Sequence, residues 1–246
     1  MMKSPKSEKR VRLVSFSGID GAGKSSQIKA LFARLNNLGV RVQVITFWEN
    51  VARLKRLREE TGHRLLKGGK GVGSPEAPIN RRDKNVRSWP ITCLRLFFYL
   101  LDALALRRIV TNVGHSPARV IIFDRYIYDE LANLKLNNVL ARAYVRLIMK
   151  LVPEPDVSFL LDADPMEAHA RKPEYPPEFT RLNRQSYLLL SGLVGGMTII
   201  PPMSMEDVER EVLSRTLFAL SNHPANRSIG VANGAAGIRH TASWLL

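Results

Sequence analysis

Apolar positions along the chain follow two different spacings, which predict an alternation of strands and helices. Short apolar runs typical of buried strands occupy residues 11–17, 120–123, 157–161 and 197–200. Residues 40–44 alternate valine with polar residues, which also predicts a strand. Between them, apolar residues at helical spacing predict helices over residues 24–38, 91–113, 127–151, 165–171, 178–193 and 205–220. We therefore expect an α/β fold, a three-layer sandwich in which helices flank both faces of a five-stranded parallel sheet. Its ligand should lie at the carboxyl ends of the strands.

The order of these elements and the composition predict one domain with loose ends. A length of 246 residues, with 45% hydrophobic and 24% charged residues, fits a single globular α/β domain. We expect that domain over residues 11–220, with a basic tail over 1–10 and a flexible tail over 221–246 that is rich in Gly, Ala, Asn and Ser. Residues 51–88 should begin as a helix and continue as a mobile basic insert.

The net charge of +15 points to a polyanionic partner. Residues 51–90 carry eleven Lys and Arg against four Asp and Glu, so much of the excess lies in one segment. A nucleotide, a nucleic acid or an anionic membrane surface would each fit this charge. Aromatic residues that stack on bases are almost absent from the segment, which argues against nucleic acid.

Targeting and redox features favour a cytoplasmic protein. The N-terminal residues MMKSPKSEKR are charged, and no apolar stretch follows them to form a signal peptide. The most apolar long segment, 90–113, contains Arg95, Asp102 and Arg107, so we expect a buried core helix rather than a membrane span. Cys93 is the single cysteine, which excludes an internal disulfide and fits a reducing compartment.

The most specific motif lies between the first strand and the first helix. Residues 18–25 read GIDGAGKS and fit the phosphate-binding pattern G-x-x-x-x-G-K-[ST] at every fixed position. Glycines let backbone N–H groups converge on one anion, and the helix N-terminus that follows favours negative charge. Lys24 would reach the β- and γ-phosphates of ATP, and the Ser25 hydroxyl would bind Mg²⁺. The residues expected to hold the nucleotide are Gly18, Ile19, Asp20, Gly21, Ala22, Gly23, Lys24, Ser25 and Ser26. The motif makes the expected sandwich a P-loop NTPase fold.

Three stretches of the sequence match one family of P-loop enzymes. They are SGIDGAGKSSQ at 17–27, VIIFDRYIYDELA at 120–132 and PDVSFLLDADPMEAHAR at 155–171. With Phe179, Arg184 and Tyr187 downstream, they resemble the thymidylate kinases over about residues 11–220. The resemblance implies a nucleotide kinase that moves the γ-phosphoryl group of ATP to a nucleoside monophosphate, dTMP or a related acceptor. It also implies a small-molecule nucleotide partner and a homodimer as one assembly.

The resemblance implies roles for a set of charged residues. Asp124 would order Mg²⁺ and its waters, and Arg125 would hold the acceptor phosphate. Arg171 begins the region 171–187 that matches the family's lid, where a cation stabilises the transferring phosphoryl group. The expected catalytic residues are Lys24, Asp124, Arg125 and Arg171; the expected substrate-binding residues are Asp20, Glu49, Arg125 and Arg184; and the expected metal ligands are Ser25 and Asp124. The plainer alternatives are a structural ion pair at Asp124 and Arg125 and a solvated surface pair at Arg171 and Lys172.

The acceptor half of the resemblance is incomplete. Residues 46–54 read TFWENVARL where the family carries Arg-Glu-Pro-Gly-Gly. Ala103 replaces an arginine that contacts thymine in the family, and Asp129 replaces a serine. The acceptor is therefore either dTMP in a rebuilt site or another compound, including a nucleoside for which Glu49 would be the general base. A competing hypothesis is an ATP-gated module that binds an anionic partner through residues 51–88.

Overall fold

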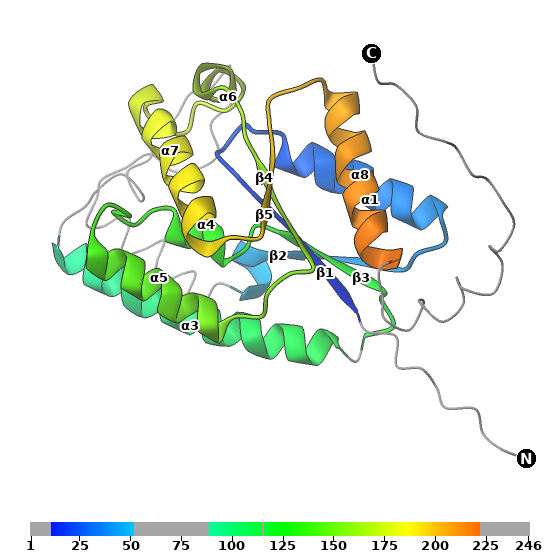
Figure 1. Ribbon diagram of the computed structural model, residues 1–246, viewed down its shortest axis with the longest axis horizontal. Coiled ribbons are helices and arrows are strands. Elements are labelled where there is room, and N and C mark those ends of the chain that lie inside the picture. Colours follow the sequence, from blue (N-terminus) through cyan, green and yellow to red (C-terminus); the bar gives the residue numbers. More distant parts are fainter. Residues whose placement is uncertain (1–10, 52–88, 115, 222–246) are drawn as a thin grey trace, which may run out of the picture.

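A five-stranded parallel sheet forms the centre of the computed structural model, which describes residues 11–51, 89–114 and 116–221 (Figure 1). The strands follow the spatial order β2-β3-β1-β4-β5. Their bounds are β1 Arg12–Ser17, β2 Val42–Thr46, β3 Val120–Asp124, β4 Val157–Leu161 and β5 Met197–Ile200. Every neighbouring pair is parallel, which confirms the α/β fold and the strands expected from the sequence.

Helices connect the strands at the expected places, with one exception described below. Their bounds are α1 Lys24–Asn37, α3 Trp89–Val113, α4 Ile127–Leu131, α5 Val139–Leu151, α6 Pro165–Arg171, α7 Pro177–Val194 and α8 Met205–Ser221, and a π-helical turn η1 covers Phe47–Val51. The predicted tails over 1–10 and 221–246 and the predicted insert over 51–88 fall almost wholly outside the described residues. Those three expectations therefore stay predictions.

Two hydrophobic clusters, one on each face of the sheet, produce the three layers. On one face, Phe16 of β1 and Ile122 of β3 pack with Leu35 of α1 and Val212 of α8. On the other face, Phe123 belongs to a larger cluster that α3, α4, α5 and α7 cover (Figure 1). Because both faces are buried, the inner strands β1, β3 and β4 read as mostly apolar runs, whereas the edge strand β2 alternates apolar and polar residues.

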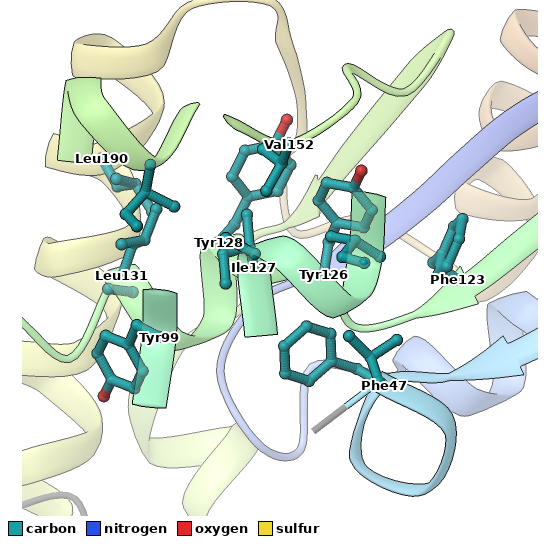
Figure 2. Packing of buried hydrophobic residues seen from close by; sticks show 14 of the residues in the cluster. Phe47, Tyr99, Phe123, Tyr126, Ile127, Tyr128, Leu131, Val152 and Leu190 are labelled. Atoms are coloured by element: carbon teal, nitrogen blue, oxygen red, sulfur yellow. The ribbon is translucent and has the colours of Figure 1, made fainter. Parts of the chain in front are cut away.

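An aromatic group fixes the junction between β3 and α4. The rings of Phe123 and Tyr126 meet edge to face with centroids 5.3 Å apart, and the ring of Tyr128 lies 5.3 Å from that of Tyr126 (Figure 2). The Tyr126 hydroxyl donates a hydrogen bond of 2.5 Å to the Pro153 carbonyl. This junction holds in place the short segment that carries Asp124 and Arg125.

The prediction of a single helix over residues 127–151 is wrong, because the structure has two helices there, α4 and α5. The Asn133 side chain donates to the Asp129 carbonyl at 2.9 Å, and the Asn138 side chain accepts from the Leu140 N–H at 2.7 Å as the N-cap of α5. Asparagine favours such local bonds over a continuing helix. The break lets α4 be fully buried while α5 lies at the surface.

The expectation of a buried core helix over residues 91–113 holds for one face of α3 only. Tyr99, Asp102 and Leu106 are buried, whereas Phe97 and Leu104 are exposed. Within the described ranges, no helix is long and apolar enough to cross a membrane. The homodimer expected from the sequence stays a prediction.

Candidate active site

The predicted phosphate loop, which connects β1 to α1, packs tightly against the end of β4 and against α6. Gly18 has φ of 139°, and a Cβ atom there would lie 2.4 Å from the Leu161 carbonyl oxygen. Gly21 has φ of 86°, and its Cβ would lie 2.1 Å from the Ala168 carbonyl oxygen. Only glycine combines this backbone conformation with so close an approach. Gly18 and Gly21 therefore let the loop pack directly against β4 and α6, which fixes the shape of the phosphate cradle.

Lys24 and the start of α1 give this cradle its positive charge. Lys24 is buried, and its Nζ donates to the carbonyl oxygens of Gly18 and Ile19, both at 2.7 Å. No side chain caps α1, and its first turn carries no acidic residue, so its N-terminal N–H groups can bind an anion. Ser25 and Ser26 are exposed in that turn. The loop and the start of α1 therefore fit the phosphate groups of a nucleotide in charge.

The expected metal ligands come from neighbouring strands. Ser25 follows the loop after β1, and Asp124 ends β3, where it lies in register with Phe16 of β1 and Thr46 of β2. Asp124 is half-buried. A hydroxyl and a carboxylate oxygen suit Mg²⁺, which takes its other ligands from phosphate and water. This donor set fits a magnesium ion at the loop.

Arg125 is held between two carboxylates at the end of β3. Its Nη1 donates to Asp129 at 3.1 Å and its Nη2 donates to Asp20. Burial by itself would lower the pKa of Arg125, but Asp20 and Asp129 together raise it well above its usual value. Its φ of 70° is a left-handed conformation that costs about 1 kcal/mol in a non-glycine residue. The surroundings therefore keep Arg125 charged and strained at the edge of the cradle.

Asp129 is a site residue that sequence reasoning noted only as a departure from the family. It is buried and accepts hydrogen bonds from Ser17 Oγ at 2.6 Å and from the Tyr187 hydroxyl at 2.8 Å, besides that from Arg125. Burial, followed by the charge of Asp129, raises the pKa of Tyr187 well above its usual value, so the hydroxyl remains a donor. The only sequence signal was an acid four residues after Arg125.

The predicted lid cations lie on the other side of the loop. Arg184 makes a bidentate pair with Asp162, with Nε and Nη2 at 2.6 Å and 2.7 Å from its two oxygens. Arg171 is exposed at the end of α6, and its Nη2 lies 3.6 Å from a Glu167 oxygen. Arg171 also lines a pocket of about 160 Å³ beside Ala22 and Gly23 of the loop.

Glu49 lies exposed in η1, directly after β2. The strand order therefore arranges the candidate groups along one edge: Glu49 after β2, Asp124 and Arg125 at β3, the cradle after β1, and the pocket after β4 and β5. Lys24 begins α1 after β1 and Arg125 directly follows the adjacent strand β3, whereas Glu49 and Arg171 lie at opposite ends of this series. The pocket therefore lies on the β4 and β5 side of the cradle, and Arg125 lies on the β3 side.

This fold and loop define a nucleotide-binding protein of the P-loop class. No family model matches the chain. The chain is 25% identical to a probable thymidylate kinase of Methanosphaera stadtmanae, over 83% of this chain and 96% of that protein. It is 29% identical to a probable thymidylate kinase of Pyrobaculum aerophilum, over 81% and 93% of the two chains.

A solved structure agrees with these relatives. A thymidylate kinase from Candida albicans shares the fold with a TM-score of 0.58 and 18% identity, over 86% of this chain and 94% of that one. The resemblance predicted from the sequence is confirmed: the chain is a homologue of the thymidylate kinases.

Proposed function

We propose that the protein is an ATP-dependent nucleotide kinase that transfers the γ-phosphoryl group to the phosphate of a nucleoside monophosphate. The observation that carries the proposal is a cationic phosphate cradle around Lys24 beside a fixed guanidinium, that of Arg125, directly after the adjacent strand β3. The homology to thymidylate kinases supports dTMP as the first acceptor to test. The altered acceptor residues make related monophosphates the next candidates.

The donor nucleotide would bind on the side of β1, β4 and β5. Lys24 and the N–H groups at the start of α1 would hold its phosphates, and the pocket beside Ala22 and Gly23 would take its base. Arg171 lines this pocket and is more than half exposed, so it can move toward the phosphates. The donor side would thus combine a site for the phosphates with an adjacent pocket for the base.

The acceptor would bind on the side of β2 and β3. Arg125 would hold its phosphate and leave one phosphate oxygen directed at the cradle. That oxygen would form the new P–O bond while the bond from the γ-phosphorus to the β-phosphate oxygen breaks. Lys24 and a lid cation would stabilise the charge on the transferring group, which supplies most of the catalysis in such reactions. Magnesium at Ser25 and Asp124 would neutralise phosphate charge when bound.

Purified protein with Mg²⁺ and ATP should be assayed against dTMP, dUMP, other nucleoside monophosphates, free deoxynucleosides and no acceptor. Lys24→Ala is the test variant. Lys29→Ala is its matched control, because Lys29 lies exposed on the same helix. The proposal predicts acceptor-dependent ADP formation that Lys24→Ala abolishes and Lys29→Ala preserves.

The acceptor that gives turnover names the substrate. Turnover with a nucleoside rather than a monophosphate would contradict the role given to Arg125 and point to Glu49. ATP binding without turnover on any acceptor would contradict the kinase and favour the ATP-gated binding module.

A further inference from the structure

Asp129 accepts four hydrogen bonds, which use both of its carboxylate oxygens fully. Oδ1 accepts from Arg125 Nη1 at 3.1 Å and from the Tyr187 hydroxyl at 2.8 Å. Oδ2 accepts from Ser17 Oγ at 2.6 Å and from the Tyr126 N–H at 3.3 Å. A carboxylate offers about four acceptor positions, so this one is saturated. Its side chain is only 2% exposed.

The four donors come from three parts of the site. Ser17 ends β1 and directly precedes the phosphate loop, Arg125 and Tyr126 form the junction after β3, and Tyr187 lies in the middle of α7. Removing the carboxylate would leave several buried donors without an acceptor, which is costly. The bond between Asp129 and Arg125 is therefore a fixed part of the fold.

The second bond of Arg125 differs in its setting. Its partner Asp20 lies in the phosphate loop, and its side chain is 11% exposed against 2% for Asp129. Asp20 lies on the cradle side of Arg125, where the anionic groups of a substrate would arrive. A phosphate can replace a carboxylate on one edge of a guanidinium while the other edge stays bound.

We propose that Asp129 is a positioning residue that holds Nη1 of Arg125 permanently, so that only Nη2 leaves Asp20 to bind the acceptor phosphate. This inference rests on the proposed function for the identity of the anion. The arrangement directs one edge of the guanidinium toward the acceptor and links its position to the phosphate loop through Ser17 and to α7 through Tyr187. The conformational entropy of the Arg125 side chain is then lost during folding rather than on binding, so the protein binds the acceptor more tightly.

The first test observes Arg125 directly by NMR of its guanidinium N–H groups in the isotope-labelled full chain, with the signals assigned by their loss in Arg125→Lys. In the free wild-type protein, the two Nη groups should give separate signals because rotation is hindered. Adding dTMP, or inorganic phosphate as a second probe, should shift one group and leave the other. Averaged signals in the wild type, shifts in both groups, or shifts in neither at saturation would overturn the proposal.

The second test compares two aspartates. Asp129→Asn should merge the two Arg125 signals and raise the KM for the acceptor monophosphate about ten- to hundredfold, with the KM for ATP unchanged. Asp156→Asn removes a carboxylate from another half-buried arginine, Arg12, and should change neither quantity. Unchanged Arg125 signals in Asp129→Asn, or equal rises in both KM values, would contradict a positioning role.

The two proposals fail in different ways. If the wild type transfers no phosphoryl group to any acceptor, the proposed function fails, while separate Arg125 signals that merge in Asp129→Asn still support the positioning role. If the wild type is an active kinase and Asp129→Asn keeps its acceptor KM, the positioning role fails alone. The wild-type NMR measurement needs no Asp129 variant, so an unfolded variant does not remove the test.

Discussion

Two half-buried arginines bond aspartates at opposite ends of the same sheet and differ in their surroundings. At the amino ends of the strands, Arg12 of β1 donates to Asp156 at 2.5 Å, and Asp156 also accepts from the Leu13 N–H at 2.9 Å. At the carboxyl ends, Arg125 bonds both Asp129 and Asp20. The same residue types thus join two strands at one end and place one arginine between two carboxylates at the other.

The backbone conformations of Arg12 and Arg125 differ more clearly than their ion pairs do. Arg12 lies in regular strand β1, where its pair joins β1 to the start of β4. Arg125 has φ of 70°, and one of its two partners lies in the phosphate loop. Strain that the surroundings maintain is a feature of functional sites. A pair should therefore be judged functional from its setting and not from its residue types.

The largest expected effect is at the carboxyl end. Lys24→Ala removes the cation from the cradle and should lower kcat by at least about a hundredfold, because charge stabilisation of the transferring group is lost. Steady-state kinetics and thermal unfolding of the same sample would check this. A variant that keeps its kcat would contradict the cradle as the donor site.

The ion pair at the amino end of the sheet should contribute to stability and not to catalysis. Asp156→Asn removes the ion pair with Arg12, whose side chain is 12% exposed, and should lower the free energy of unfolding by about 2 kcal/mol. Turnover per folded molecule and both KM values should not change. Urea unfolding together with kinetics measures both. A loss of turnover that exceeds the loss of folded protein would make the comparison between the two ends invalid.

Two glycines in the cradle sharpen the comparison within the carboxyl end. Gly21 and Gly23 both have φ of 86°, but an added Cβ meets the Ala168 carbonyl oxygen at 2.1 Å only at Gly21 and meets nothing within 4 Å at Gly23. Gly21→Ala should therefore cost at least about 1 kcal/mol more stability than Gly23→Ala. Equal losses in urea unfolding would show that contact with α6 does not constrain the loop.

The smallest expected effect is the loss of stability in alkali. Burial raises the pKa of Tyr187 and Tyr126, and it raises that of Tyr144 to about 12. Because the unfolded chain loses these protons near pH 10 and the folded chain keeps them, stability should fall as pH rises above 10. Urea unfolding at several pH values should show a shallower fall for Tyr144→Phe. Identical slopes for both proteins would exclude Tyr144 as a contributor.

Local patterns predicted the sheet and the phosphate loop because each is recorded in a short stretch of sequence. The inner strands read as mostly apolar runs, the edge strand β2 shows an alternation of apolar and polar residues, and residues 18–25 carry the whole loop motif. The break between α4 and α5 was missed because the apolar spacing continues through it, although Asn133 and Asn138 were available signals.

The candidate site was predicted only in part for a physical reason. Lys24, Asp124 and Arg125 lie within motifs, whereas the partners of Asp129 come from residues 17 and 187, far away in the chain. The ion pair of Arg184 with Asp162 likewise joins two motifs that are separate along the sequence. Contacts of this kind are fixed by the fold, and one sequence does not contain them in local form.

The most direct test of the central claim is to follow dTMP and a panel of other nucleoside monophosphates in Mg²⁺ and ATP, with the products separated by chromatography. The account predicts that ADP and one nucleoside diphosphate appear in equal amounts, and that neither appears with Lys24→Ala. ADP formed without a matching diphosphate, or no ATP consumption with any monophosphate, would contradict it.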